Sequence, residues 1–383
     1  MKERVLKSED LRIILYIMLM FVVSRTIMYL IYRGMYGDGS IMNCIHGFNI
    51  WDAEWYEGYA KGFLNGQFPW NYDGATTWAF FPLFPLMLAV AYRVLHFKLE
   101  ILLIGTIVSN VCFLLAEYIA YKYIMLTRRS IKVAYAFITF MSLGLYAFYY
   151  TITYTEALYL FFLVLSFYFM KKEQYIFMGI SGAFLSATRN TGVMFVFAIL
   201  IWRIMVYVKE KGKEGNVGDF IISNLKNEKL VLGTVMVPAG IFAYILFLIH
   251  KTGDGFAFVH VQKVWGRDYK GFFNVLVHSF RDHFPPDYLG LFTFVSFLLI
   301  LYLIVRYKNF DEMFIPVIVL LMGGSSSFMS MPRFMIGSFS LVLGFAEEYA
   351  KMNKVAKVVV AAGFFAFELV LIEQWVTPNS LLW

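Results

Sequence analysis

The chain has 383 residues, of which 60% are hydrophobic and 15% are charged, compared with about 25% charged residues in soluble domains. This composition excludes a soluble globular protein and predicts an all-α polytopic membrane protein, because about 20 apolar residues cross a bilayer as a helix. The net charge of +7 is compatible with nucleic-acid binding, but the Lys and Arg residues lie in short blocks between apolar runs, which is typical of membrane topology. The two cysteines, Cys44 and Cys112, provide neither a disulfide framework nor a CxxC metal signature.

The first predicted span covers about residues 13–33 and follows a basic N-terminus, which is therefore predicted to be cytoplasmic. It leads into a first external loop at residues 34–99. Within this loop, residues 79–95 are apolar, but two prolines near their start and a length of about 17 residues suit either a span or an interfacial helix. Charge favours the interfacial helix, because a crossing there would place the following basic blocks on the wrong side.

Ten further spans are predicted along the rest of the chain, with the basic blocks between them on the cytoplasmic side. They cover about residues 101–124, 133–150, 154–170, 175–187, 191–207, 230–250, 288–305, 312–324, 334–350 and 358–376. A second large external loop lies at residues 251–287, and residues 1–383 are predicted to form a single transmembrane domain of eleven spans. No half-to-half repeat of the kind common in transporters is evident.

The external segments hold nearly all the residues that could carry chemistry, so a functional site is predicted on the outer face. These residues are Asp52, Glu54, Glu57, Asp73, Glu156, Arg189, His260, Lys263, Arg267, Asp268, Asp282, His283 and Arg333. The sequence has no P-loop, serine-hydrolase or zinc-protease motif, which excludes the function classes that those motifs mark.

Two carboxylates, Asp52 and Glu54, lie in the segment Trp-Asp-Ala-Glu-Trp-Tyr shortly after the first span. A helix there would place Asp52 and Tyr56 on one side, facing a cavity. Trp51 and Trp55 would lie on another side, at the lipid interface. The alternative is an interfacial helix whose acids are merely solvated. Carboxylates cost too much in hydrocarbon to be left unpaired, which favours chemistry at the membrane surface.

Glu156 begins an apolar run, where it either serves the site or interacts favourably with the helix macrodipole from the first turn. Arg189 lies between two apolar stretches that are short for full spans, and no acid neighbours it in the sequence. A guanidinium at such a break suits a phosphate.

Two further arginines have open alternatives. Arg333 follows a turn of small residues and either binds a phosphate or snorkels to the interface. Arg25 lies well inside the first span, where it either pairs internally, for example with Glu156, or reaches a ligand phosphate.

These motifs resemble those of the GT-C glycosyltransferases, in particular the PIG-V family, which comprises the second mannosyltransferase of GPI-anchor assembly and its prokaryotic relatives. The matching segments are residues 51–56 (WDAEWY), 80–85 (FFPLFP), 154–158 (YTEAL), 187–192 (ATRNTG) and, more loosely, 262–265 and 332–334. The resemblance implies an inverting transfer of a sugar, with mannose expected, from a polyprenyl-phosphate donor to a lipid or glycan hydroxyl on the extracytoplasmic face. The membrane would be the plasma membrane of a prokaryote or the endoplasmic reticulum of a eukaryote.

Such a transfer needs one base for the acceptor hydroxyl and cations for the departing phosphate, but no general acid, since the leaving group is already an anion. We assign Asp52 as the base and Glu54 as its catalytic support. The candidate donor-phosphate ligands are Arg189, Arg333 and Arg25. The candidate acceptor-binding or supporting residues are Glu156, Tyr56, Trp51, His260 and Lys263.

Asp52 and Glu54 could instead form an acid-x-acid metal site. A lipid-monophosphate donor needs a divalent ion less than a pyrophosphate donor does, so no cofactor is expected. The expected partners are the polyprenyl-phosphate sugar, the acceptor and membrane lipids, without nucleic acid. The alternative from another class is a transporter or flippase for lipids or lipid-linked sugars, which would not need Asp52 as a titratable base.

Overall fold

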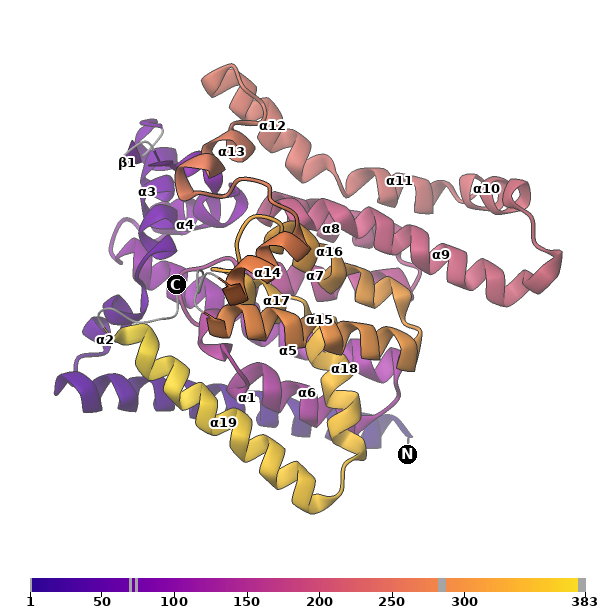
Figure 1. Cartoon of the computed structure of the whole chain (residues 1–383), viewed down its shortest axis with the longest axis horizontal. Helices are drawn as coiled ribbons and strands as arrows, with labels where there is room; N and C mark the ends of the chain where they lie inside the picture. The colour runs from indigo at the N-terminus through magenta and orange to yellow at the C-terminus, as the bar shows by residue number, and fades with distance from the viewer. Residues whose placement is uncertain (1, 69–70, 73–74, 282–286, 378–383) are drawn as a thin grey trace. The chain divides into compact units, whose positions relative to one another are not determined.

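The computed structural model describes residues 2–68, 71–72, 75–281 and 287–377. These residues are predominantly helical (Figure 1). They include one short antiparallel pair, β1 (Asn71–Tyr72) and β2 (Ala75–Thr76), in which Asn71 lies opposite Thr76. The chain packs into two compact units, and each is described separately below.

The first unit comprises Met1–Trp70, Phe84–Phe161 and Val342–Trp383. Its elements are α1 (Lys2–Tyr36), α2 (Ile41–Phe48), α3 (Asp52–Asn65), α4 (Leu83–Val94), α5 (Ile101–Thr127), α6 (Ile131–Leu143), the 3₁₀ turn η2 (Ala147–Tyr150), α18 (Phe339–Lys351) and α19 (Lys354–Val376). In this unit α1 packs against α5, α6 and α19, and α5 packs against α6. The unit therefore combines the first and the last long helices of the described chain.

The second unit comprises Asn71–Leu83 and Phe162–Leu341. Besides β1 and β2, its elements are η1 (Thr77–Ala79), α7 (Glu156–Lys171), α8 (Tyr175–Thr188), η3 (Asn190–Met194), α9 (Phe195–Lys211), η4 (Gly212–Glu214), α10 (Val217–Leu225), α11 (Glu228–Met236), α12 (Ala239–Thr252), α13 (Ala257–His260), η5 (Val261–Trp265), α14 (Phe272–Arg281), α15 (Asp287–Tyr307), α16 (Phe310–Gly324) and α17 (Met331–Ile336). Helices α4, α7 and α18 have residues in both units. In the second unit α8 packs against α11 and α12, while α16 packs against α9, α15 and α17.

Close packing of α8 against α11 depends on glycine. A Cβ atom on Gly233 of α11 would lie 2.0 Å from the Tyr175 carbonyl oxygen of α8, and one on Gly179 would lie 2.5 Å from the Gly233 carbonyl oxygen. Small residues let the backbones of membrane helices approach closely, and van der Waals contact then holds the helices together.

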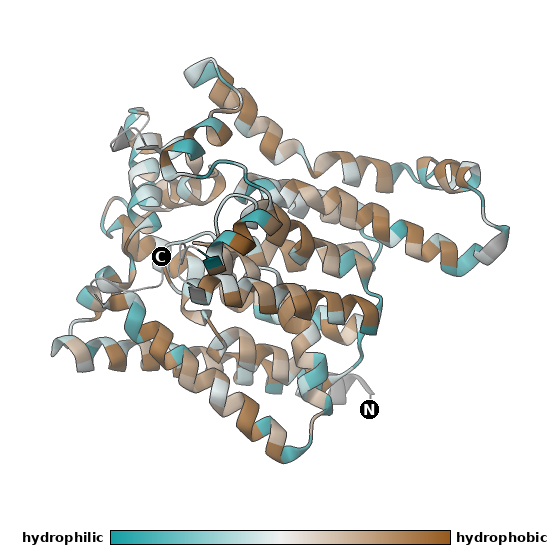
Figure 2. Cartoon of the chain, in the orientation of Figure 1, coloured by the Kyte–Doolittle hydropathy of each residue, from teal (hydrophilic) through white to brown (hydrophobic). Residues whose placement is uncertain are grey.

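Six helices of the described residues are long and apolar enough to cross a membrane. They are Ser8–Tyr36, Ile101–Thr127, Asn190–Lys211, Glu228–Thr252, Tyr288–Tyr307 and Lys354–Val376. Their apolar windows are only 17% to 44% buried within the protein, which leaves faces for lipid. Figure 2 shows apolar residues along these helices and polar residues at many of the connecting turns. Six of the eleven predicted spans coincide with these helices, and the chain is an integral, multi-pass membrane protein.

The other five predicted spans coincide with shorter helices. α6 and α18 have 13 residues each, α8 has 14, α16 has 15 and α7 has 16, whereas a straight crossing takes about 17–25 residues. The count of eleven crossings thus stays a prediction. α4 lies within the apolar stretch 79–95 and has 12 residues, which span about 18 Å of a hydrocarbon core about 30 Å thick. The interfacial placement of α4 also stays a prediction.

Candidate functional site

The acidic aromatic segment forms the start of α3, as predicted. Trp51 precedes the helix with φ 59° and ψ −112°, a region that residues other than glycine rarely occupy and that costs about 1–3 kcal/mol. This turn makes Asp52 the first residue of α3, with Glu54 also in the first turn. Both carboxylates interact favourably with the positive end of the helix macrodipole.

The two acids differ in their surroundings. Asp52 is partly buried, whereas Glu54 is exposed, and Tyr56, one turn after Asp52, is buried. Trp51 lies on the surface, with 44% of its area exposed. The spacing i, i+4 places Asp52 and Tyr56 on one side of α3, as the sequence predicted.

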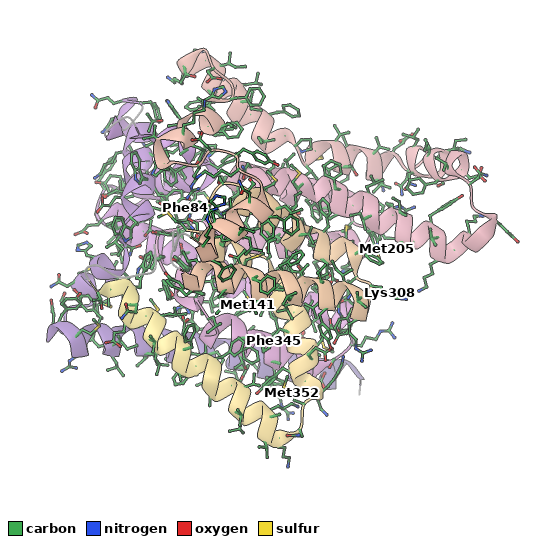
Figure 3. All side chains as sticks on the ribbon, viewed as in Figure 1. Phe84, Met141, Met205, Lys308, Phe345 and Met352 are labelled. Atoms are coloured by element: carbon green, nitrogen blue, oxygen red, sulfur yellow. The ribbon has the colours of Figure 1, made fainter. Side chains whose placement is uncertain are left out.

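Segments far apart in the sequence meet around Asp52. The backbone N–H of Asp52 donates to the Tyr154 hydroxyl at 3.2 Å, and this hydroxyl donates to the Ile50 carbonyl oxygen at 3.0 Å. The hydroxyls of Tyr56 and Thr155 lie 3.2 Å apart. The Tyr56 ring packs edge-on against the ring of Phe84, which is labelled in Figure 3, and the two ring centres are 5.3 Å apart. Three of the segments quoted in the sequence analysis therefore contact one another in the first unit.

Two asparagine side chains, Asn49 at the end of α2 and Asn110 in α5, hold the loop that leads to Glu156. Asn49 donates to Thr106 Oγ1 at 3.0 Å and accepts a hydrogen bond from the backbone N–H of Thr153. Asn110 of α5 donates to the Thr151 carbonyl oxygen at 3.3 Å. These hydrogen bonds to the Thr153 N–H and the Thr151 carbonyl oxygen fix the loop in place. The loop continues into Tyr154, which contacts Asp52.

Glu156 is the first residue of α7, where a carboxylate interacts favourably with the macrodipole. Its side chain is 0% exposed. Burying a carboxylate is costly unless its charge is compensated, so this acid is more than a solvated helix cap. The sequence placed Glu156 at an outer turn but gave no sign of its burial.

Arg25 contacts groups inside the first unit. Its Nε donates to Asn110 Oδ1 at 2.9 Å and its Nη1 donates to Ser24 Oγ at 2.8 Å. Glu117 of α5 is an acid with which it interacts electrostatically. These contacts favour the internal alternative for Arg25, with Glu117 as the acidic neighbour in place of Glu156.

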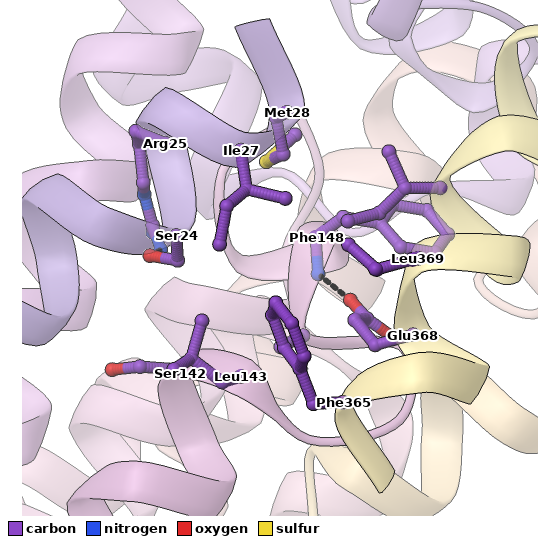
Figure 4. A pocket seen from close by; sticks show the side chains of 12 residues that line it. Ser24, Arg25, Ile27, Met28, Ser142, Leu143, Phe148, Phe365, Glu368 and Leu369 are labelled. Atoms are coloured by element: carbon purple, nitrogen blue, oxygen red, sulfur yellow. Dashed lines mark hydrogen bonds between the residues drawn. The ribbon is translucent and has the colours of Figure 1, made fainter. Parts of the chain in front are cut away.

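A buried acid that the sequence analysis did not single out caps the turn η2. The carboxylate of Glu368, on α19, accepts hydrogen bonds from the backbone N–H groups of Tyr146 at 2.6 Å and Phe148 at 3.2 Å. Figure 4 shows the bond from Phe148. Figure 4 shows the small pocket between α1, α6 and α19 that Glu368 lines. The signal that could have found Glu368 is an acid within an apolar run, since a carboxylate at such a position needs a partner.

Arg189 stands at a helix break in the second unit, as predicted. It ends α8 in an extended conformation with φ −154° and ψ 149°, and η3 follows directly. The turn needs Gly192, because a Cβ atom there would lie 2.3 Å from the Leu185 carbonyl oxygen.

The structure brings Arg189 and Arg333 together. Each guanidinium carbon lies 5.3 Å from the centre of the Phe334 ring, so the two groups are separated by no more than about twice that distance. Both side chains are partly buried. A ring face attracts a cation without occupying its N–H donors, so it can hold both guanidinium groups at one place.

Residues of the predicted second external loop lie near the turn that precedes Arg333. Arg267 Nη2 donates to Ser330 Oγ at 3.2 Å, and the N–H groups of Lys270 and Gly271 donate to the Ser325 carbonyl oxygen at 2.8 and 2.9 Å. The loop is thereby fastened to the turn that precedes α17, the helix that carries Arg333.

Two predicted supporting residues lie on the surface of the second unit. His260 Nδ1 is 2.7 Å from Asp254 Oδ2, and this hydrogen bond lowers the pKa of the Asp254 carboxyl. Lys263 in η5 is exposed. Of the other predicted outer residues, Asp73, Asp282 and His283 lie outside the described part of the chain.

Among the residues that the structure describes, no group of three or more His, Cys, Asp and Glu side chains is placed to hold a metal ion. The chemically notable side chains are instead the carboxylates Asp52, Glu54 and Glu156 of the first unit and the cations Arg189 and Arg333 of the second.

Comparison with known proteins identifies the fold. No family profile and no curated protein sequence matches the chain. Among solved structures, the crystal structure of ArnT from Cupriavidus metallidurans bound to undecaprenyl phosphate is similar, with a TM-score of 0.53 over 91% of this chain. The two sequences are 12% identical, and the match spans 64% of the ArnT chain. The chain thus has the all-α polytopic membrane fold of the GT-C type, as predicted.

Proposed function

We propose that this protein is a membrane glycosyltransferase that moves a hexose, mannose foremost, from a polyprenyl-phosphate donor to a hydroxyl of a lipid or glycan. Transfer takes place on the extracytoplasmic face with inversion of the anomeric centre. Kinship with the PIG-V family is part of this proposal. The observation that carries it is the contact of residues 52–56 with Phe84, Tyr154 and Thr155, beside a partly buried Asp52. The GT-C type fold supports the proposal.

In the proposed reaction Asp52 takes the proton of the acceptor hydroxyl. The acceptor oxygen then forms the bond to the anomeric carbon while the bond from that carbon to the phosphate oxygen breaks. The polyprenyl phosphate leaves with an additional negative charge, which Arg189 and Arg333 stabilise. Glu54 and Glu156 support the base or bind the acceptor, and Tyr56 and Trp51 shape its surroundings.

The decisive variant is Asp52→Asn, which keeps the size of the side chain but cannot accept a proton. We expect hexose transfer from a synthetic polyprenyl-phosphate hexose to fall about 10²- to 10⁴-fold, while donor binding to the purified protein changes little. Glu54→Gln, on the exposed side of the same helical turn, is the matched control and should cost less.

A wild-type rate for Asp52→Asn would make this acid structural and turn attention to Glu156 as the base. The other class of function, a lipid or lipid-linked sugar transporter, is an outcome of the same study. It would take over if no donor supported transfer while vesicles containing the protein moved the lipid across the bilayer.

We further propose that the reaction needs no divalent cation, since one acid and two arginines supply the base and the phosphate-stabilising charge. Transfer should therefore continue at an unchanged rate after dialysis against EDTA. Loss of activity that Mg²⁺ or Mn²⁺ restores would instead indicate a metal site at Asp52 and Glu54.

A further inference from the structure

We propose that Tyr154 is a positioning residue for Asp52, acting through the main chain on either side of Trp51. This inference rests on the proposed function, in which Asp52 is the base. Tyr154 makes no contact with reacting atoms in this scheme, and its effect on the reaction is exerted through Asp52.

The Tyr154 hydroxyl hydrogen-bonds to the main chain on both sides of Trp51. It accepts from the N–H of Asp52 at 3.2 Å and donates to the carbonyl oxygen of Ile50 at 3.0 Å. The same carbonyl oxygen also accepts from the N–H of Ala53 at 3.3 Å. One hydroxyl thus fixes the separation of the two peptide groups that flank Trp51.

The residue between those peptide groups needs this support. Trp51 has φ 59° and ψ −112°, a backbone conformation that an L residue rarely adopts. Such a conformation persists only where the surroundings determine it. If the backbone of Trp51 changed to a more common conformation, Asp52, the first residue of α3, would move.

Tyr154 is itself rigid enough to serve as a reference point. Its side chain is 1% exposed. Its ring packs against the rings of Trp375 and Tyr149, whose centres lie 6.1 and 5.8 Å from its own. Ser109 Oγ donates a hydrogen bond to the Tyr154 backbone carbonyl oxygen at 3.4 Å. Helix α19 and the turn η2 therefore hold the ring of Tyr154, and α5 holds its backbone, before any substrate arrives. A base held in advance need not be reoriented during the reaction.

The test is Tyr154→Phe, which removes a single oxygen atom. Because a displacement of about 1 Å at a reacting group can cost about 10²-fold in rate, we expect kcat to fall about 10- to 100-fold. The KM for the polyprenyl-phosphate hexose should stay within about twofold, since the donor phosphate is bound by other residues. Replacing Tyr154 with 4-aminophenylalanine, which restores a hydrogen-bonding group, should recover part of kcat.

The double variant Asp52→Asn, Tyr154→Phe separates a positioning role from a general loss of structure. If Tyr154 acts through Asp52, the double variant transfers sugar at the rate of Asp52→Asn alone. A further drop that multiplies the two single effects would overturn the inference. The matched control is Tyr121→Phe, another buried tyrosine of the first unit, whose hydroxyl donates to Asp10 at 2.7 Å; it should leave kcat unchanged.

The outcomes for this inference and for the proposed function differ. A wild-type kcat for folded Tyr154→Phe, with Asp52→Asn impaired, overturns the positioning role alone. Wild-type rates in both variants overturn the proposed function as well. Should Tyr154→Phe not fold, the 4-aminophenylalanine variant carries the same double-variant comparison, and additivity there overturns the inference.

Discussion

At the residue scale, the shared ring of Arg189 and Arg333 links two guanidinium groups that are far apart in the sequence. Each lies 5.3 Å from the centre of the Phe334 ring. Two like charges that share one ring repel, and an anion bound to both would offset the repulsion. The planar fork of arginine matches the geometry of a phosphate, so the pair suits a phosphate better than a simple halide ion.

We expect Arg189→Lys, which keeps the charge but loses the planar fork, to lower kcat/KM for the donor about 10-fold, and Arg189→Ala to lower it about 10²-fold. The corresponding Arg333 variants should behave alike. Arg203→Ala is the matched control in the same unit, because Arg203 Nε donates to Asn224 Oδ1 at 2.6 Å on a different segment. Normal donor use by Arg189→Ala would remove this residue from the mechanism.

The sequence predicted these residues more readily than their contacts. Asp52 and Arg189 could be identified, since charged groups beside apolar runs need a reason to be there. The conformation of Trp51, the hydroxyl of Tyr154 and the cap made by Glu368 could not, because each depends on a partner that lies far along the chain. For the same reason, the sequence suggested Glu156 as the acidic neighbour of Arg25, whereas the structure has Glu117.

At the element scale, the break at Arg189 was predicted correctly, but the lengths of several helices were not. The apolar run at 133–150 suggested one span, whereas α6 ends at Leu143 and Ala147–Tyr150 forms the turn η2. The aromatic residues of η2 are buried by protein, and Phe148 packs against Trp375 at 5.3 Å. Hydropathy reports only that a side chain avoids water, so it does not separate burial in protein from burial in lipid.

The contact between α8 and α11 gives a prediction at this scale. Gly233→Ala places a methyl group against the Tyr175 carbonyl oxygen, where the Cβ would lie 2.0 Å away. We expect the variant to be destabilised by about 1–3 kcal/mol, the usual effect of overpacking. The measurement is thermal unfolding of the purified protein in detergent.

The matched control for this prediction is Gly363→Ala. Gly363 also lies within a helix, α19, but a Cβ atom there meets nothing within 4 Å. Alanine has the higher helix propensity, so this variant should unfold at the same temperature or stabilise the protein by up to about 1 kcal/mol. Equal unfolding temperatures for the two variants would show that α8 and α11 do not depend on close contact.

At the scale of the whole molecule, the orientation in the membrane can be tested with a thiol reagent. Asn65, at the exposed end of α3, lies in the predicted external loop. In a Cys44→Ser background, Asn65→Cys should react with a membrane-impermeant reagent in intact cells. Ser223→Cys, on the exposed helix α10 in a predicted cytoplasmic connection, should react only after lysis.

The native thiols interfere little with this measurement. Both are buried, and burial raises the pKa of the Cys44 thiol to about 11, so little of it is thiolate at neutral pH. Labelling of wild-type protein should therefore be slow at pH 7 and faster as the pH approaches 11. If Asn65→Cys reacted only after lysis, the orientation would be inverted, and the carboxylates would face the cytoplasm.

Because α19 packs within the first unit, this unit can be completed only after the C-terminal part of the chain has been synthesised. Glu368 of α19 accepts hydrogen bonds from the N–H groups of Tyr146 and Phe148. Trp375 of the same helix donates to the Phe48 carbonyl oxygen at 2.9 Å. At about 5–20 residues per second, the ribosome makes Glu368 on the order of 10–50 s after the turn η2 that it caps. Until α19 is inserted, the N–H groups of Tyr146 and Phe148 lack their final partner. The first unit therefore cannot be completed until one of the last helices of the chain is made, and a ribosome that stalls before Glu368 leaves the Tyr146 and Phe148 N–H groups without this acceptor.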